Sequence, residues 1–301
     1  MQFGIIGLGR MGLNMARRLR RAGLPLAAWN RSFDKAEALA AEDGALACRT
    51  LEELVQALTP PRICWLMLPA GPAVDAHLDQ VLPLLAPGDI LVDGGNSWYK
   101  DDLRHAAVCN TVGVQYVDAG VSGGVWGLSE GYCTMVGGPA QAVAVLAPYL
   151  DALAPPHGWM HCGGTGSGHF VKMIHNGIEY GMMQAYAEGL GLIQASGYGK
   201  DLDMAALCHL WNQGSVIRSW LLELAERAFA EDPALEGLAG HVEDSGEGRW
   251  TVLESIELAQ PAPVLALSLM QRFRSRQENT FQDRILAALR REFGGHAVKE
   301  T

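Results

Sequence analysis

The stretch that decides the fold is Phe3-Gly4-Ile5-Ile6-Gly7-Leu8-Gly9-Arg10-Met11-Gly12. An apolar run typical of a buried strand leads into the pattern Gly-x-Gly-x-x-Gly, and residues 11–21 continue with helical spacing. The three glycines allow a tight turn, the close approach of a pyrophosphate and close packing of the helix on the strand. The helix N-terminus would present unpaired N–H groups to the phosphates. We therefore expect a dinucleotide site at Gly7, Gly9, Arg10, Met11 and Gly12.

Strand and helix signals alternate through the first half of the chain, and the pattern changes near the glycine-rich run at 163–168. Strands that alternate with helices indicate a mostly parallel sheet with helices on both faces. Beyond that run the strand signals stop. The sequence therefore predicts an α/β fold, with an N-terminal Rossmann-like doubly wound sheet over residues 1–165 and an all-α helical domain over residues 166–301.

Helical spacing predicts a long central helix over residues 169–195, which is about seven turns at roughly 3.6 residues per turn. Shorter helices are expected over residues 204–210, 215–229, 250–258, 263–276 and 281–292. Each glycine inside a helix costs roughly 1 kcal/mol relative to alanine. The central helix nevertheless holds four, which indicates close packing against another helix or a ligand: Gly177, Gly181, Gly189 and Gly191.

The end of the second expected strand, over residues 26–29, bears on the choice of cofactor. NAD-specific folds usually place Asp or Glu there to hold the ribose 2′-hydroxyl, but this chain has Asn30-Arg31-Ser32. Arg31 is suited to pair with a 2′-phosphate and to stack on adenine, and Asn30 and Ser32 to add hydrogen bonds. This favours NADP and leaves NAD open. The expected cofactor site also includes Leu68, Pro69, Ala70 and Asn96.

The composition narrows the class of protein. Of the 301 residues, 49% are hydrophobic and 19% charged, which supports a sizeable core and argues against a disordered chain. The formal net charge of −10 argues against binding to the phosphate backbone of nucleic acid. Six arginines between Arg272 and Arg291 form a local basic cluster that suits a small anion.

Targeting and metal signals are also weak in the sequence. No apolar stretch reaches the roughly 18 residues of a transmembrane helix, and the N-terminus lacks the basic and apolar regions of a secretory signal. The six cysteines form no Cys-x-x-Cys pair and no metal-ligand spacing. We therefore expect reduced thiols, no bound metal, no membrane contact and a cytoplasmic location.

The central helix carries a polar stripe. Lys172, His175, Asn176 and Glu179 lie at i, i+3, i+4 and i+7 and so share one helical face, between apolar neighbours. Polar groups on a buried helix are hydrogen-bonded or face a cavity. A stripe of solvated salt bridges is the alternative, and the flanking glycines and apolar residues argue against it.

Two glycine-rich segments follow expected strands and so belong at the carboxyl edge of the sheet, where doubly wound folds bind ligands. The first, at residues 93–97, places Asn96, an amide that can donate to and accept from a polyol. The second, Ser122-Gly123-Gly124, combines a hydroxyl with bare backbone amides that suit a carboxylate. A plain glycine turn is the simpler interpretation of either segment alone.

Three stretches together resemble the 6-phosphogluconate dehydrogenase family. They are residues 93–101 (DGGNSWYKD), residues 121–127 (VSGGVWG) and residues 166–181 (GSGHFVKMIHNGIEYG). Residues 246–251 and 290–296 extend the resemblance over the whole chain, and its length is similar to that of the short, bacterial-type form. The wider β-hydroxyacid dehydrogenase superfamily shares the Rossmann half and the lysine but not the GGN segment or the glutamate.

The resemblance implies oxidative decarboxylation of 6-phosphogluconate to ribulose 5-phosphate and CO₂, as in the pentose phosphate pathway and gluconate metabolism. It implies that Lys172 is the general base and acid and Glu179 the second acid. It also implies a substrate site made of Asn96, Ser122, Gly123, Gly124, His175, Asn176, Tyr180, Arg272, Arg290 and His296, with the last two reaching the phosphate from a neighbouring subunit. One departure concerns the phosphate lysine of the family, because Ser245 precedes Gly246 here.

Two rival functions stay open at this point. One is a β-hydroxyacid dehydrogenase acting on an unphosphorylated acid such as 3-hydroxyisobutyrate or gluconate. The other is a non-catalytic NADP-binding protein. The helical half alone is too thin to bury its apolar side, so we also expect a homodimer or homotetramer.

Overall fold

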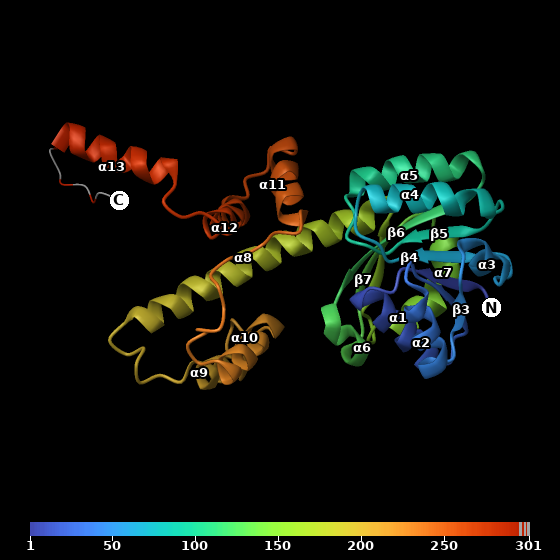
Figure 1. Ribbon diagram of the computed structural model, residues 1–301, viewed down its shortest axis with the longest axis horizontal. Helices are drawn as coiled ribbons and strands as arrows, with labels where there is room; N and C mark the ends of the chain where they lie inside the picture. The colour runs from blue at the N-terminus through green and yellow to red at the C-terminus, as the bar shows by residue number, and fades with distance from the viewer. Residues whose placement is uncertain (295–296, 298, 300–301) are drawn as a thin grey trace. The chain divides into compact units, whose positions relative to one another are not determined.

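The computed structural model describes residues 1–294, 297 and 299. The chain divides into two compact units, Met1–Asn176 and Gly177–Thr301. The predicted boundary at 165/166 lies before the long central helix, whereas the compact units divide within that helix. Figure 1 shows the first unit as a sheet with helices on both faces and the second as helices alone. An α/β fold followed by an all-α region is therefore confirmed.

Eight strands form one sheet in the first unit, in the order β3-β2-β1-β4-β5-β6-β7-β8. Neighbouring strands are parallel except β6 and β7. The chain leaves β1 toward β2 and β3 on one side and returns to β4 on the other, which is the switch point of a doubly wound sheet. The strands are β1 (Phe3–Ile6), β2 (Leu26–Trp29), β3 (Leu46–Cys48), β4 (Ile63–Leu66), β5 (Ile90–Asp93), β6 (Gln115–Ser122), β7 (Cys133–Gly137) and β8 (Trp159–Gly163).

Each face of the sheet has its own apolar core. Residues of α1 (Arg10–Arg21), α2 (Phe33–Asp43) and α7 (Ala140–Leu153) pack on one face. Residues of α3 (Leu51–Gln56), α4 (Pro72–Val81) and α5 (Tyr99–Thr111) pack on the other. The central strands are buried on both faces, which explains why β1, β4 and β5 read as continuous apolar runs. Two 3₁₀ turns, Leu82–Leu84 and Gly124–Trp126, and the short α6 (Gly127–Glu130) complete this unit.

The second unit is built on the long helix α8 (Ser167–Ala195), which begins in the first unit. The other helices are α9 (Met204–Asn212), α10 (Trp220–Glu231), α11 (Glu247–Glu257), α12 (Pro263–Arg274) and α13 (Phe281–Gly294). The prediction that a helix begins at residue 215 is wrong, although a helix does follow. The Ser219 side chain accepts the N–H of Leu222 and so begins α10 one residue later, at Trp220.

The glycines of α8 only partly meet the expectation of close packing. A Cβ on Gly177 would lie 2.7 Å from Cγ2 of Thr251, and one on Gly181 would lie 3.3 Å from Cδ2 of Leu265, so both pack closely on neighbouring helices. A Cβ on Gly189 or Gly191 would meet no atom within 4 Å among the described residues, so close packing at these two positions stays a prediction.

The first turns of α8 lie directly on β6 and β7. A Cβ on Gly120 would lie 2.3 Å from Cβ of Lys172, and one on Gly168 would lie 2.5 Å from the carbonyl oxygen of Met135. Real Cβ atoms do not approach this closely, so only glycine fits at these two positions. This contact fixes where the polar stripe of α8 meets the sheet.

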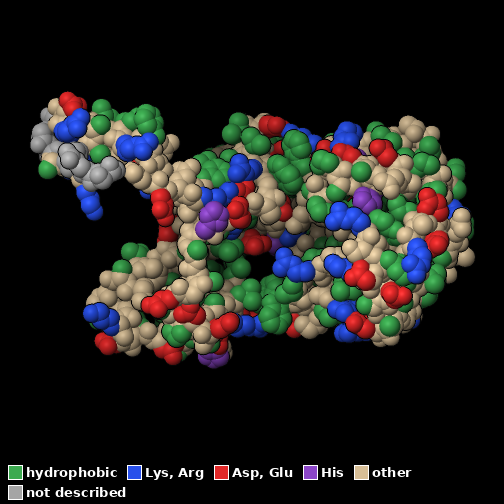
Figure 2. Space-filling model, viewed as in Figure 1, with side chains coloured by type: hydrophobic (Ala, Val, Ile, Leu, Met, Phe, Trp, Pro, Cys, Tyr) green, Lys and Arg blue, Asp and Glu red, His purple; other side chains and the backbone are tan. Residues whose placement is uncertain are grey.

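The surface agrees with the acidic composition. Basic and acidic side chains are interspersed over the face seen in Figure 2, and the described residues of that face show no extended basic surface of the kind that nucleic acid binds. No helix among the described residues combines the length and apolar character needed to cross a bilayer.

Candidate active site

The carboxyl ends of β1, β4, β5 and β6 meet at one edge of the sheet. The loops that follow these strands hold the glycine-rich turn, residues 68–70, residues 94–97 and residues 122–124. In doubly wound folds, ligands bind in the crevice at this edge. The first unit therefore brings together four of the segments that the sequence assigns to cofactor and substrate.

The glycine-rich turn has the geometry of a dinucleotide site. Gly7 has a φ of 102° and donates its N–H to the carbonyl of Trp29. A Cβ on Gly12 would lie 2.1 Å from the carbonyl oxygen of Gly7, so the protein's own packing requires this glycine. A Cβ on Gly9 would meet no described atom within 4 Å. Packing does not explain Gly9, whereas a phosphate seated on the start of α1 does.

The Asn30-Arg31-Ser32 turn follows β2 at the same edge. The Asn30 side chain accepts the N–H of Leu8 at 2.8 Å and donates to the carbonyl of Ser32 at 3.0 Å. Asn30 therefore joins the two turns that would border the adenine ribose. Arg31 and Ser32 are exposed.

The polar stripe on α8 forms a connected group within the first unit. Lys172 is buried, and its Nζ donates to Oδ1 of Asn176 at 2.7 Å and lies 3.4 Å from Nδ1 of His175. Nε2 of His175 lies 3.5 Å from Oγ of Ser122, at the end of β6. The structure thus joins Lys172, His175, Asn176 and Ser122 in one cluster at the sheet edge. Of the nearby loop residues, Asn96 and Gly124 are exposed and Gly123 is half-buried.

The predicted phosphate end lies in the second unit. The guanidinium of Arg272 stacks 3.5 Å from the ring centroid of Tyr180 and donates to the carbonyl of Glu243 at 2.8 Å. The N–H of Ser245 donates to the Tyr180 hydroxyl at 3.3 Å, and its own hydroxyl donates to Glu247. Glu247 is buried, and its Oε1 has no hydrogen-bond partner among the described residues. At the position where the resemblance implies a lysine, this chain therefore has a serine that is bonded to a buried carboxylate.

The remaining predicted residues are not brought to these clusters. Glu179 lies in the second unit and is half-buried, so its pairing with Lys172 stays a prediction from helical spacing. Arg290 is exposed on α13. His296 lies outside the described residues.

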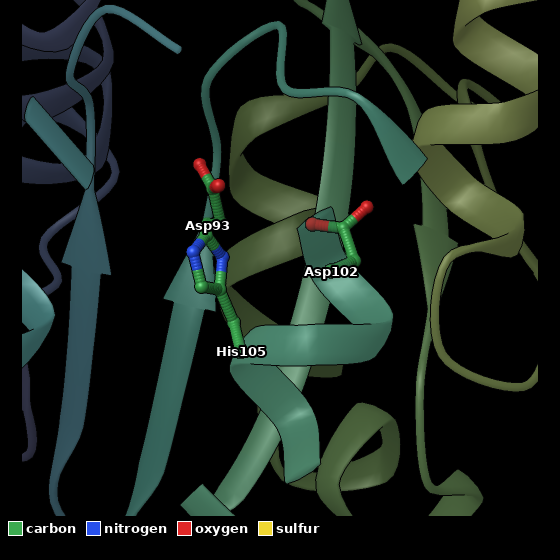
Figure 3. Close-up of side chains that lie close together, drawn as sticks. All are labelled: Asp93, Asp102 and His105. Carbon is green, nitrogen blue, oxygen red and sulfur yellow. The ribbon is translucent and has the colours of Figure 1, made fainter. Parts of the chain in front are cut away.

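A buried polar network contacts the loop that carries Asn96, and none of the sequence patterns described above predicts it. Figure 3 shows that Asp93, at the end of β5, lies close to Asp102 and His105 of α5. Asp93, Asp102 and Asp118 have no exposed surface, and His169 of α8 is 1% exposed. A carboxylate at the end of an apolar strand, as in ILVD, is the signal that was available, because burial of a charge requires partners.

The hydrogen bonds of the network are enough to account for the burial of these carboxylates without a metal ion. Asp102 accepts from His169 Nδ1 and from the Tyr116 hydroxyl, both at 2.8 Å. Asp93 accepts from Ser97 Oγ at 2.6 Å and from the N–H of Gly95 at 3.0 Å. Asp93, Asp102 and His105 lie close enough to hold a metal. The carboxylate oxygens are however already used by N–H and O–H donors.

For both His169 and Asp102, burial and the charge of the other residue shift the pKa in opposite directions. Desolvation lowers the pKa of His169, but the charge and hydrogen bond of Asp102, then the charges of Asp93 and Asp118, raise it to about 9. Desolvation raises the pKa of Asp102, His169 lowers it, and the result is about 6. Burial and the neighbouring carboxylates raise the pKa of Tyr116 well above its ordinary value, so it stays a donor to Asp102. Near neutral pH the pair is therefore an imidazolium with a carboxylate.

Comparisons with known proteins cover both halves of the chain. The family model described as the NAD binding domain of 6-phosphogluconate dehydrogenase matches residues 2–164. The model described as the 6-phosphogluconate dehydrogenase C-terminal domain matches residues 168–297. Together the two models span both compact units.

Individual relatives agree with these two family models. The chain is 45% identical over 300 residues to an NAD(+)-dependent, decarboxylating 6-phosphogluconate dehydrogenase of Haloferax volcanii, covering 99% of this chain and 98% of that protein. An NADP(+)-dependent enzyme of Bacillus subtilis is 34% identical over 90% of this chain, which spans 61% of its length. The solved 6-phosphogluconate dehydrogenase of Plasmodium falciparum has a TM-score of 0.84 at 29% identity, over all of this chain and 66% of that one.

The buried pair predicts a dependence of stability on pH. His169 binds its proton more tightly in the folded chain, with a pKa of about 9, than at its ordinary value of 6.5. The resulting stabilisation is complete below pH 6.5 and is lost as the pH rises through 9. We expect the free energy of unfolding in urea to fall by on the order of 1 kcal/mol or more between pH 7 and pH 10. A His169→Asn chain should lose this part of the slope, and an equal slope in both chains would contradict the assignment.

Proposed function

The chain belongs to the 6-phosphogluconate dehydrogenase family, and from that premise we propose how its own residues carry out the reaction. The activity is the NAD(P)-dependent oxidative decarboxylation of 6-phospho-D-gluconate to D-ribulose 5-phosphate and CO₂. The rival functions are not favoured, because the substrate-binding half as well as the dinucleotide half matches this family. The observation that carries the residue assignments is the buried cluster of Lys172, Asn176, His175 and Ser122 at the sheet edge.

The cofactor fits the edge of the sheet around β1. The bare space at Gly9, the N-terminus of α1 and the turn at residues 30–32 would hold the pyrophosphate and the adenine ribose. Residues 68–70 and Asn96, at the ends of β4 and β5, would border the nicotinamide end. When bound, the nicotinamide supplies the hydride acceptor for C3 of the substrate.

Lys172 is suited to be the general base. Its burial disfavours the charged ammonium form, and its hydrogen bond to Asn176 Oδ1 fixes the direction of Nζ. As a neutral amine it takes the proton of the C3 hydroxyl while the hydride leaves C3. The 3-keto acid that results has its carbonyl β to the carboxylate. The protonated Lys172 then stabilises the charge on the C3 oxygen as the C1–C2 bond breaks and CO₂ leaves.

The other assignments divide the substrate between the two ends. Ser122, Gly123, Gly124, His175 and Asn96 would hold the carboxylate and the hydroxyls next to it. Glu179 would protonate the carbon that lost CO₂. Tyr180 and Arg272 would bind the phosphate, together with Arg290 and His296. The hydrogen bond from Ser245 to Tyr180 places this serine beside the same group, and it supplies no positive charge there.

Substitution of the two catalytic residues tests the mechanism. Lys172→Met should lower kcat by about 10²–10⁴-fold, because it removes the proposed acceptor of the C3 proton. NADPH binding, followed by fluorescence, should be unchanged.

Glu179→Ala should still transfer hydride in a rapid-mixing experiment but should release ribulose 5-phosphate slowly. Normal turnover by Lys172→Met would remove the base assignment, and loss of hydride transfer in Glu179→Ala would remove the role of the second acid.

Cofactor preference follows from the turn after β2. We propose NADP as the preferred cofactor, because an exposed Arg31 stands where NAD-specific folds carry an acid. Arg31→Glu should lower the ratio of kcat/KM for NADP over NAD by about tenfold or more through loss of a charge-assisted contact. Arg21→Glu, an exposed arginine at the end of α1, is the matched control. A wild-type preference for NAD, as in the Haloferax volcanii relative, would overturn the proposal.

The helical unit supports a homodimer. A cavity of about 570 Å³ between α8, α9 and α10 is lined almost wholly by apolar side chains. Large apolar side chains are exposed on α12 and α13, among them Leu267, Phe281 and Leu286. Surfaces of this kind normally lie at interfaces, and a second copy of the chain would cover them.

Light scattering coupled to gel filtration tests the dimer. The mass should be at least twice that of one chain, and Leu286→Glu should shift it toward one chain because a buried charge would oppose the contact. Val108→Glu on α5 places the same charge on an exposed apolar position of the first unit and should leave the mass unchanged. A monomer at micromolar concentration would contradict the proposal.

A further inference from the structure

His169 makes two hydrogen bonds that join different parts of the first unit. Nδ1 lies 2.8 Å from Oδ2 of Asp102 on α5, and Nε2 lies 3.1 Å from the carbonyl oxygen of Gly95. Both ring nitrogens therefore face oxygen acceptors. A neutral imidazole has only one N–H, so this geometry fits the doubly protonated ring, which donates at both positions.

The Gly95 bond reaches the loop that carries Asn96. Gly95 precedes Asn96, and its own N–H donates to Asp93 Oδ1 at 3.0 Å. A Cβ on Gly95 would lie 2.8 Å from the carbonyl oxygen of Leu68, so the loop is also pressed against the segment after β4. The peptide groups on either side of Gly95 are thus held from opposite ends, one by Asp93 and one by His169.

The other end of the connection is the first turn of α8. The backbone N–H groups of Gly166 and His169 donate to Asp118 at 2.6 and 2.9 Å, which fixes this turn on β6. Lys172 is three residues further along, so it lies on the same face one turn later. His169 therefore links the Asn96 loop directly to the helix that carries the lysine.

We propose that His169 is a positioning residue, which holds the Asn96 loop at a fixed distance from Lys172 through the Gly95 carbonyl. This inference rests on the proposed roles of Asn96 and Lys172. The inference assigns a different task to each ring nitrogen of His169. The Nδ1 bond neutralises a buried carboxylate and acts on stability, whereas the Nε2 bond contributes nothing to Asp102 and acts on the loop.

The groups facing His169 support this division. Asp102 on α5, Asp93 at the end of β5 and Asp118 on β6 surround it with negative charge. Tyr116 donates to Asp102 and, at 3.5 Å, to Asp93, and His105 lies beyond Tyr116 on the branch that leads to Asp75 at the surface. Among the described contacts, the His105 side chain forms no hydrogen bond with residues 94–97. It therefore offers a control in which a buried histidine of the same network is changed without altering the connection to Gly95.

Two substitutions of His169 separate the tasks. Asn places its amide nitrogen near the position of Nδ1 and keeps a donor to Asp102, and Gln places its nitrogen near Nε2 and keeps a donor to Gly95. His169→Asn keeps a donor to Asp102 but loses the positive charge, so at pH 7 it should unfold at a lower urea concentration than the wild type. Its kcat/KM for 6-phosphogluconate should fall by on the order of 10²-fold, the effect of a small misplacement. His169→Gln also loses the donor to Asp102, so it should be less stable than His169→Asn but keep kcat/KM within about fivefold. NADPH binding should stay within about twofold in His169→Gln.

Hydrogen exchange measured by mass spectrometry gives a readout that does not need turnover. Peptides covering residues 94–97 should exchange faster in His169→Asn than in His169→Gln or wild type. His105→Gln, the matched control, should leave both the exchange of this loop and kcat/KM unchanged. If kcat/KM follows stability, and so falls further in His169→Gln than in His169→Asn, the role of His169 is purely structural and the inference is overturned. Wild-type kcat/KM in His169→Asn would overturn it as well.

The two levels of the proposal can fail separately. If wild-type protein does not convert 6-phosphogluconate, the proposed function fails, and the hydrogen-exchange comparison still decides whether His169 holds the loop. If wild-type protein is active and the loop exchanges equally in all variants, the function stands and the positioning role is wrong.

Discussion

The close packing of the start of α8 on the sheet is the constraint on which the rest of the structure depends. Cβ of Lys172 lies so near the backbone of Gly120 that no side chain fits there, and Gly168 meets the backbone of β7 in the same way. A helix can approach a strand this closely only where one of the two facing residues is a glycine. The start of the lysine side chain is therefore fixed against β6 at Gly120 by close packing on the backbone, and not by the flexible end of the side chain.

Much of the fold follows from the sequence because its signals are local. The Gly-x-Gly-x-x-Gly turn, the apolar strands and the long helix each depend on residues within a few positions of one another, and the structure confirms them. The sequence does not predict the short β3 or the helices α3, α4 and α5, since their mixed composition blurs the apolar period. Helix α7 is hidden for another reason, because it is apolar on nearly all sides and contains Pro148. The start of α10 was set by a serine cap, which tertiary context selects from several candidates.

The site was less predictable than the fold, for a physical reason. Lys172, His175 and Asn176 share a helical face, so spacing alone groups them. Asp93, Asp102, Asp118 and His169 come from two strands and two helices, and they meet only when the sheet and both helices are assembled. The sequence marks each of them as a charge among apolar residues, but it does not say which one pairs with which.

A buried group of three carboxylates is costly unless donors surround it, and this cost explains why the network is so completely bonded. Apolar residues of similar size would stabilise the fold equally well or better. They would not provide two directed bonds from one ring, one to α5 and one to a loop that has no regular structure of its own. Because a loop keeps its shape only through such contacts, the charged pair is better explained by what it holds in place than by any gain in stability.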